Sequence, residues 1–284
     1  MPTPRTLALT LLAMLAFAGN SLLCRLALRD TGIDAASFTL VRVVSGAAVL
    51  WFIVRLREGD AHAGEGDWAS AAALFAYAAC FSFAYLGLAA GTGALLLFGA
   101  VQMTMIGWGL WRGERLGMLQ TAGFALASAG LVGLLLPGLS APPLPSAALM
   151  LAAGAAWGVY SLRGRRAADP LRATSGNFLR AVPLAVALSL ALLPGANIDP
   201  RGAAYAVASG AITSGLGYAI WYAALRGLDA TRAAVVQLSV PALTAAGGVA
   251  LLAEPVTARL IVASAAVLGG VAAVIVARRR PASP

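Results

Sequence analysis

The chain has 284 residues, of which 60% are hydrophobic and 11% are charged, and its formal net charge is +9. A soluble domain carries roughly 25% charged residues, so this composition excludes an ordinary water-soluble protein and indicates a membrane protein. All 20 basic residues are arginines, which excludes chemistry that needs a lysine amine, such as a P-loop or a Schiff base.

Ten apolar segments are long enough to cross a bilayer, whose hydrocarbon core of roughly 30 Å takes about 20 helical residues. In chain order they cover residues 6–24, 36–56, 69–88, 91–111, 117–136, 146–162, 173–193, 202–222, 231–253 and 257–277. Mostly short linkers separate them and leave no room for a soluble domain. The predicted fold class is therefore an all-α integral membrane protein with ten transmembrane helices.

The first segment has an alternative interpretation as a signal peptide, since Arg5 precedes an apolar run and Ala16-Phe17-Ala18 resembles a cleavage site. The apolar character continues past this site to Leu28, which favours a retained helix. Removal of the helix would also leave an internal repeat without its counterpart.

The two halves of the sequence repeat each other at a shift of 140 residues. Residues that recur include Ser21 and Ser161, Phe38 and Phe178, Thr104 and Thr244, and Glu114 and Glu254. Each half holds five segments, an odd number, so the second half must enter the membrane from the opposite side. We therefore predict two inverted five-helix repeats, residues 1–140 and 141–284, an arrangement typical of secondary transporters with a substrate site between the halves.

The placement of arginine predicts the orientation. With a cytoplasmic N-terminus, 14 arginines fall on the cytoplasmic side and four on the other side, while Arg42 and Arg180 lie inside segments. Cytoplasmic loops are enriched in arginine, so both termini are predicted to be cytoplasmic. The arginines sit between apolar runs rather than on one polar face, so the basic charge does not indicate a nucleic-acid partner.

Polar and aromatic residues inside the segments are the candidates for a substrate site, because polar groups at membrane depth are costly and mark substrate pathways. They come from both halves: Asn20, Tyr77, Phe81, Tyr85, Phe98, Gln102, Trp157, Tyr160, Tyr218, Trp221, Tyr222 and Gln237. Tyr77, Phe81 and Tyr85 recur at every fourth residue and share one helix face. In the alternative interpretation, the aromatic residues are packing groups or interfacial anchors and the Gln side chains link helices.

Several charged residues have predicted structural roles. Glu114 and Glu254 begin segments five and ten, where a carboxylate stabilises the positive end of the helix. Arg42 and Arg180 are expected to extend their guanidinium groups to the membrane edge, with pairing to a substrate carboxylate as the alternative. Pro241 lies inside segment nine and is expected to kink it.

The same residue types argue against an enzyme. One His (His62) and two Cys (Cys24 and Cys80) cannot build a His/Cys metal site, and no cofactor is expected. A membrane-embedded enzyme would need clustered His, Asp, Cys or Ser/Lys residues at membrane depth, and the inverted repeat disfavours a purely structural protein. No Asp or Glu lies at the centre of a segment, so obligatory proton coupling is not expected.

The stretch GTGALLLFGAVQMTM at residues 91–105 resembles the fourth helix of bacterial transporters of the drug/metabolite transporter superfamily, EamA branch. Trp157-Gly158 in segment six and the positions of Glu114 and Glu254 are similar to the same branch, whereas segment one carries Phe17-Ala18 in place of Trp-Gly. The resemblance covers almost the entire chain. It implies a multi-pass inner-membrane carrier that works by alternating access through a cavity built by helices one, three, four, six, eight and nine.

Within the branch, the chain resembles the YddG-type exporters of aromatic amino acids. The resemblance implies export of small amphipathic metabolites, aromatic or neutral amino acids first. The alternative is a different solute, such as a drug, a quaternary amine or a nucleoside. The expected partners are the lipid bilayer and a small-molecule substrate, with no nucleic acid and no obligatory protein partner.

Overall fold

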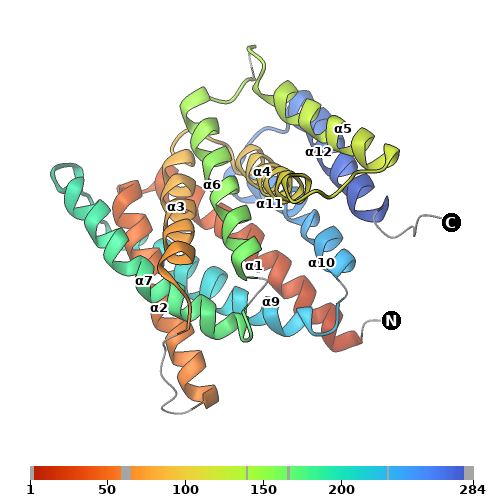
Figure 1. Cartoon of the computed structure of the whole chain (residues 1–284). Coiled ribbons are helices and arrows are strands. Elements are labelled where there is room, and N and C mark those ends of the chain that lie inside the picture. Colours follow the sequence, from red (N-terminus) through yellow and green to blue (C-terminus); the bar gives the residue numbers. More distant parts are fainter. Residues whose placement is uncertain (1–2, 59–64, 139, 165–166, 229, 278–284) are drawn as a thin grey trace.

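The computed structural model describes residues 3–58, 65–138, 140–164, 167–228 and 230–277, and all its regular structure in these residues is helical (Figure 1). The helices are α1 (Pro4–Asp30), α2 (Ala35–Glu58), α3 (Trp68–Ala84), α4 (Ala90–Trp111), α5 (Met118–Leu135), α6 (Leu144–Gly164), α7 (Pro170–Ala191), η1 (Leu193–Gly195), α8 (Pro200–Val207), η2 (Ala208–Leu216), α9 (Gly217–Leu225), α10 (Ala230–Gln237), α11 (Ser239–Leu252) and α12 (Ala258–Ala277). The prediction of an all-helical protein is confirmed for these residues.

Within the described residues, eight helices are long and apolar enough to cross a membrane by length and composition. They are α1, α2, α4, α5, α6, the continuous stretch Pro200–Leu225, the stretch Arg232–Leu252, and α12. The apolar helix α3 is shorter, with 17 residues, and α7 carries Arg172, Asn177 and Arg180 in its first half. Ten crossings and two cytoplasmic termini remain predictions.

The helices of the two halves interlock. At one edge α5 lies against α12, at the opposite edge α2 lies against α7, and the remaining helices fill the space between (Figure 1). In the centre α4 packs on α6, and α11 packs on α1. At the 140-residue shift α4 corresponds to α11 and α6 to α1, so these two contacts are counterparts of each other.

Small residues allow this close approach. On α6, Gly154 and Gly158 form the four-residue spacing that lets membrane helices pack backbone to backbone. A Cβ at Gly154 would lie 2.6 Å from the carbonyl oxygen of Leu97, and one at Gly158 would lie 2.8 Å from Cβ of Thr104. This packing sets the distance of α6, and of its Trp157 side chain, from α4.

The segment η2 is a π-helix between α8 and α9. Wide turns of this kind occur often at functional sites. Its Gly210 lies directly on α2, where a Cβ would overlap the Ser45 Oγ and the carbonyl oxygen of Arg42. The chain therefore has room for glycine alone at this position unless α2 and η2 separate.

We expect Gly210→Ala to destabilise the protein, because overpacking of this kind costs about 1–3 kcal/mol. The measurement is the thermal unfolding midpoint of purified protein in detergent. Gly133→Ala on α5 is the matched control, since nothing among the described residues lies within 4 Å of its added Cβ. Equal midpoints for the two variants would contradict the packing argument.

Segment nine was predicted to be one helix with a kink at Pro241, but the structure divides it into two helices. Pro241 has no N–H with which to bond the carbonyl of Gln237, four residues earlier. The helix accordingly ends as α10 at Gln237 and restarts as α11 at Ser239, with a tighter Leu238 N–H to Val235 C=O bond of 3.1 Å at the junction. The break places Gln237 at the end of α10.

The role predicted for Glu254 is wrong in one respect. Its Oε2 accepts a 2.7 Å hydrogen bond from the backbone N–H of Ala90, the first residue of α4. The carboxylate therefore stabilises the N-terminus of α4, and α12 begins only at Ala258. The chain enters α12 through residues 253–257, and this turn carries the carboxylate back toward α4.

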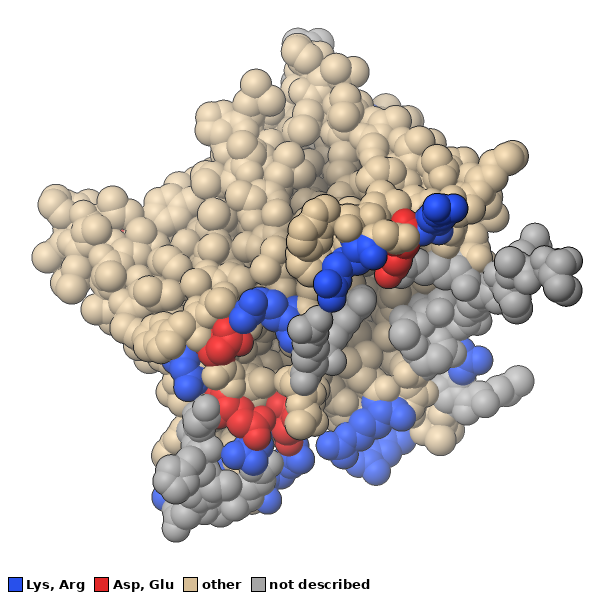
Figure 2. Space-filling model, in the orientation of Figure 1, with Lys and Arg blue, Asp and Glu red and all other residues tan. Residues whose placement is uncertain are grey.

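The surface is apolar over wide areas. Figure 2 shows the Arg, Asp and Glu side chains of the visible face gathered in its lower and right-hand parts, while the upper part carries none. Large apolar side chains such as Leu11, Met118 and Val262 are exposed. Extended exposed apolar surface of this kind fits contact with lipid.

Candidate substrate cavity

A cavity of about 330 Å³ lies in the centre of the helices. Ten of the twelve predicted site residues line it: Asn20, Tyr77, Phe81, Phe98, Trp157, Tyr160, Tyr218, Trp221, Tyr222 and Gln237. The lining comes from the helices that the family resemblance implies and also from α7, through Ala173, Thr174 and Asn177. The cavity brings these residues together, and their part in substrate binding stays a prediction.

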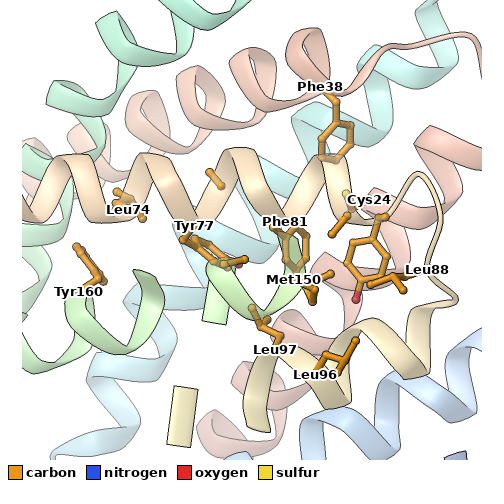
Figure 3. Packing of buried hydrophobic residues seen from close by; sticks show 14 of the residues in the cluster. Cys24, Phe38, Leu74, Tyr77, Phe81, Leu88, Leu96, Leu97, Met150 and Tyr160 are labelled. Carbon is orange, nitrogen blue, oxygen red and sulfur yellow. The ribbon is translucent and has the colours of Figure 1, made fainter. Parts of the chain in front are cut away.

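Trp157 is the centre of an aromatic wall. Its ring centroid lies 4.8 Å from that of Tyr77 on α3, 5.2 Å from that of Tyr160 and 5.4 Å from that of Tyr218 on α9. The Trp157 and Tyr218 rings are stacked, with 17° between their planes. Figure 3 shows Tyr77 and Phe81 next to each other along α3. Three helices from both halves therefore contribute to one aromatic surface.

Phe17 extends the wall on α1. Its ring centroid lies 5.9 Å from those of Tyr218 and Trp221. It occupies the place that the repeat assigns to a counterpart of Trp157, and it lines the cavity. The sequence pointed to it only through that correspondence.

A buried polar network closes one end of the cavity. Ser209 on η2 donates a 2.7 Å hydrogen bond to Oδ1 of Asn20, and Thr213 lies 3.3 Å from the same oxygen. Asn20 Nδ2 donates to the hydroxyl oxygen of Tyr77 at 3.3 Å, and Arg42 Nη2 donates to the same oxygen at 2.9 Å. The π-helix thus supplies two hydroxyl groups to a residue that the sequence analysis singled out.

The predicted position of Arg42 at the membrane edge is wrong. Its side chain is only 2% exposed, and its guanidinium carbon lies 5.2 Å from the Tyr77 ring centroid and 4.8 Å from that of Phe81. Arg42 Nη1 has no hydrogen-bond partner among the described residues. Arg180, by contrast, donates to the carbonyl oxygen of Glu65, which lies just before the start of α3.

A second polar cluster lies on the α7 side of the cavity. The Tyr160 hydroxyl donates to Thr174 Oγ1 at 3.1 Å, and Thr174 Oγ1 lies 2.8 Å from the hydroxyl of Tyr222. These bonds join α6, α7 and α9. Because α7 reaches the cavity only through tertiary packing, hydrophobic periodicity gave no signal for Thr174.

Tyr85 and Gln102 do not line the cavity among the described residues. Tyr85 is fully buried with its ring edge against Phe81, and its hydroxyl donates to the carbonyl oxygen of Ala90 at 3.3 Å. On α4 the cavity face is formed by Leu97, Phe98, Val101 and Met105. Gln102 lies at the margin of this face, about 40° of helix rotation from Phe98 and about 100° from Val101, and its buried side chain is not part of the lining.

Residues 144–276 match the EamA-like transporter family. The second half of the chain is therefore an EamA-like transporter domain. The chain is 58% identical, over 98% of its own length and 97% of the relative's, to an uncharacterized protein of Pseudomonas aeruginosa. It is also 26% identical to an uncharacterized transporter of Archaeoglobus fulgidus, over 85% of this chain and 87% of that one. A solved crystal structure, 21% identical, matches 99% of this chain and all of the other with a TM-score of 0.70, which shows a shared fold.

The cavity reaches toward one end of the helices. Its lining includes Gly164, Ala167 and Pro170, at the connection of α6 with α7. At this mouth Asp67 accepts hydrogen bonds from Ser70 Oγ at 2.7 Å and from Arg163 Nη2 at 2.8 Å. The bond from Ser70, with that from Arg163, lowers the pKa of Asp67 to about 2, so the carboxylate stays charged and ties α3 to α6.

The opposite end is closed. Ser21 lines the cavity, and Arg25 follows one turn later on the same face of α1. Arg25 Nε lies 3.2 Å from Glu254 Oε1, and Arg25 Nη1 donates to the carbonyl oxygen of Tyr85 at 2.8 Å. Through Arg25 and Glu254 the start of α4 and the end of α3 are held against α1.

Proposed function

We propose that this transporter, placed in a bacterial inner membrane, exports small amphipathic solutes that carry an aromatic ring, aromatic amino acids foremost. The observation that carries the proposal is the aromatic wall of Tyr77, Trp157 and Tyr218, which lies inside a cavity that is closed at one end. Burial of an aromatic side chain contributes roughly 1.5–3 kcal/mol, and favourable ring pairs add about 0.5–1.5 kcal/mol. A cavity of about 330 Å³ is at the lower end of small-molecule sites.

The closed and open ends support alternating access. In the predicted orientation the mouth beside Gly164 faces the cytoplasm and the Arg25–Glu254 pair closes the outer end. A solute would enter from the cytoplasm in this state. Exchange of the roles of the two halves would then open the outer end, as inverted repeats allow.

Quaternary amines are the second candidate substrate, because aromatic walls bind such cations through their π-faces. Trp157 and the rings around it would provide that surface. The guanidinium of Arg42 behind Tyr77 and Phe81 argues against a cation at this end of the cavity.

We expect purified protein in liposomes to accelerate the movement of labelled phenylalanine down its gradient. Tryptophan and tyrosine should compete, whereas aspartate should not, because it has no ring to bury. Since the described residues that line the cavity include neither Asp nor Glu, collapse of a pH gradient should leave the initial rate unchanged. Protein-containing liposomes that move no aromatic solute faster than empty ones would contradict the proposed function.

A further inference from the structure

The hydrogen bonds at Tyr77 have a defined direction. Arginine carries donors only, so Arg42 Nη2 donates to the Tyr77 oxygen. Asn20 turns its Nδ2 to the same oxygen, because its Oδ1 accepts from Ser209. Both lone pairs of the Tyr77 hydroxyl are therefore occupied, and only its own proton is left to donate.

This proton has no acceptor among the described residues, although Tyr77 lines the cavity. All hydrogen bonds of the network therefore point toward the Tyr77 hydroxyl: Ser209 donates to Asn20, and both Asn20 and Arg42 donate to Tyr77. A bound molecule that offers a hydrogen-bond acceptor would complete it. An anionic acceptor would form the stronger, charge-assisted bond.

The buried positive charge of Arg42 also favours an anionic ligand. None of the ion pairs within the described residues involves Arg42, and Nη1 has no partner there. The rings of Tyr77 and Phe81 offset part of the cost of this buried charge. A buried cation without a counter-charge is otherwise strongly unfavourable at membrane depth.

We propose that Tyr77, backed by Arg42, is a carboxylate-recognition site at the Asn20 end of the cavity, so that the transporter selects aromatic solutes that carry a carboxylate. This inference rests on the proposed transport of aromatic solutes and narrows the substrate class. Tyr77 donates its proton to the carboxylate. Arg42 does not line the cavity among the described residues, so it acts as a positioning residue that fixes the hydroxyl and supplies positive potential.

The test compares three probes with the same ring and chain: 3-phenylpropionate, its neutral amide, and the cation 3-phenylpropylamine. Binding to purified protein is measured by the ligand-induced rise in thermal unfolding midpoint, and uptake is measured in liposomes. We expect 3-phenylpropionate to bind about tenfold to a hundredfold more tightly than the amide, the range for a hydrogen bond to a charged group. We expect the amine to bind most weakly.

Tyr77→Phe removes the proton while keeping the ring. We expect this variant to bind the acid and the amide with affinities within about threefold of each other, because the acid loses the stronger, charge-assisted bond. Tyr205→Phe is the matched control, because the Tyr205 hydroxyl accepts from Arg201 on α8, outside the cavity. Arg42→Met should lower the preference for the acid while the amide still binds.

Comparable binding of acid, amide and amine to the unchanged protein would overturn the carboxylate site while leaving aromatic transport intact. A preference for the acid that survives in Tyr77→Phe would overturn the role of this hydroxyl. Failure of all three probes to bind or move would overturn the proposed function and the inference with it. The comparison within the unchanged protein decides the question even if a variant does not fold.

Discussion

Replacement of Trp157 with alanine is expected to lower the transport rate of a labelled aromatic solute by about tenfold to a hundredfold. The ring contacts Tyr77, Tyr160 and Tyr218, so its removal opens the centre of the aromatic wall. A bound ring loses one face of contact, worth about 0.5–1.5 kcal/mol for the aromatic pair in addition to lost apolar burial. The measurement is the initial uptake rate in liposomes at matched protein content.

Trp111→Ala is the control for this prediction, because Trp111 is 74% exposed at the end of α4. The same chemical change there should leave transport close to that of the unchanged protein. Transport by Trp157→Ala at the rate of the control would mean that the aromatic wall serves packing alone. Monodisperse elution of both variants in detergent excludes misfolding as the cause.

Replacement of Glu254 with alanine is expected to open the closed end of the cavity. Arg25 and Glu254 are only 16% and 10% exposed, and Glu254 also holds the first N–H of α4. Loss of one partner of a buried ion pair costs several kcal/mol, about 3–5 kcal/mol for fully buried pairs. Since each 1.4 kcal/mol or so is tenfold in an equilibrium, the open population should rise at least about tenfold.

The measurement is the rate at which a membrane-impermeant thiol reagent, added to intact cells, labels a cysteine at position 21. The protein carries Ser21→Cys in a background with Cys24 and Cys80 replaced by serine. Asp30→Asn is the control, because its ion pair with Arg29 is about one-third exposed and surface pairs contribute little. Equal labelling of Glu254→Ala and the control would contradict the role of the pair as the outer closure.

Much of the helical fold could be predicted because long apolar segments of the sequence indicate where the helices lie. A run of about 20 apolar residues has one stable form in lipid, in which every backbone group is satisfied within the helix. Each of the ten predicted segments overlaps helix in the described residues, although segment 69–88 continues past the end of α3 and segment 231–253 is divided between α10 and α11. The aromatic candidates on α3, α6 and α9 could be found for a related reason, since large rings of both halves occur at corresponding depths.

The residues whose position or role was predicted incorrectly depend on contacts between helices. Arg42 is buried because Gly210 lets η2 rest directly on α2, and the hydropathy of segment two carries no trace of η2. Gln102 was selected for its depth along α4, while its direction depends on which face of α4 meets the cavity. Glu254 stabilises a helix N-terminus, as carboxylates commonly do, but this is the N-terminus of α4, which is distant in sequence and becomes a neighbour only after folding.

The π-helix η2 determines the direction in which the side chains of the following helix, α9, point. Each α-helical residue turns the chain by about 100°, whereas a π-turn accommodates one more residue in a slightly wider loop. The directions of Tyr218 and Trp221 are therefore set by winding at 208–216, upstream of the residues themselves. A return of that stretch to α-helical winding, with the same number of residues, would rotate both rings by about 100° relative to the helices before it. The aromatic surface of α9 would then turn away from Trp157 although no aromatic residue had changed.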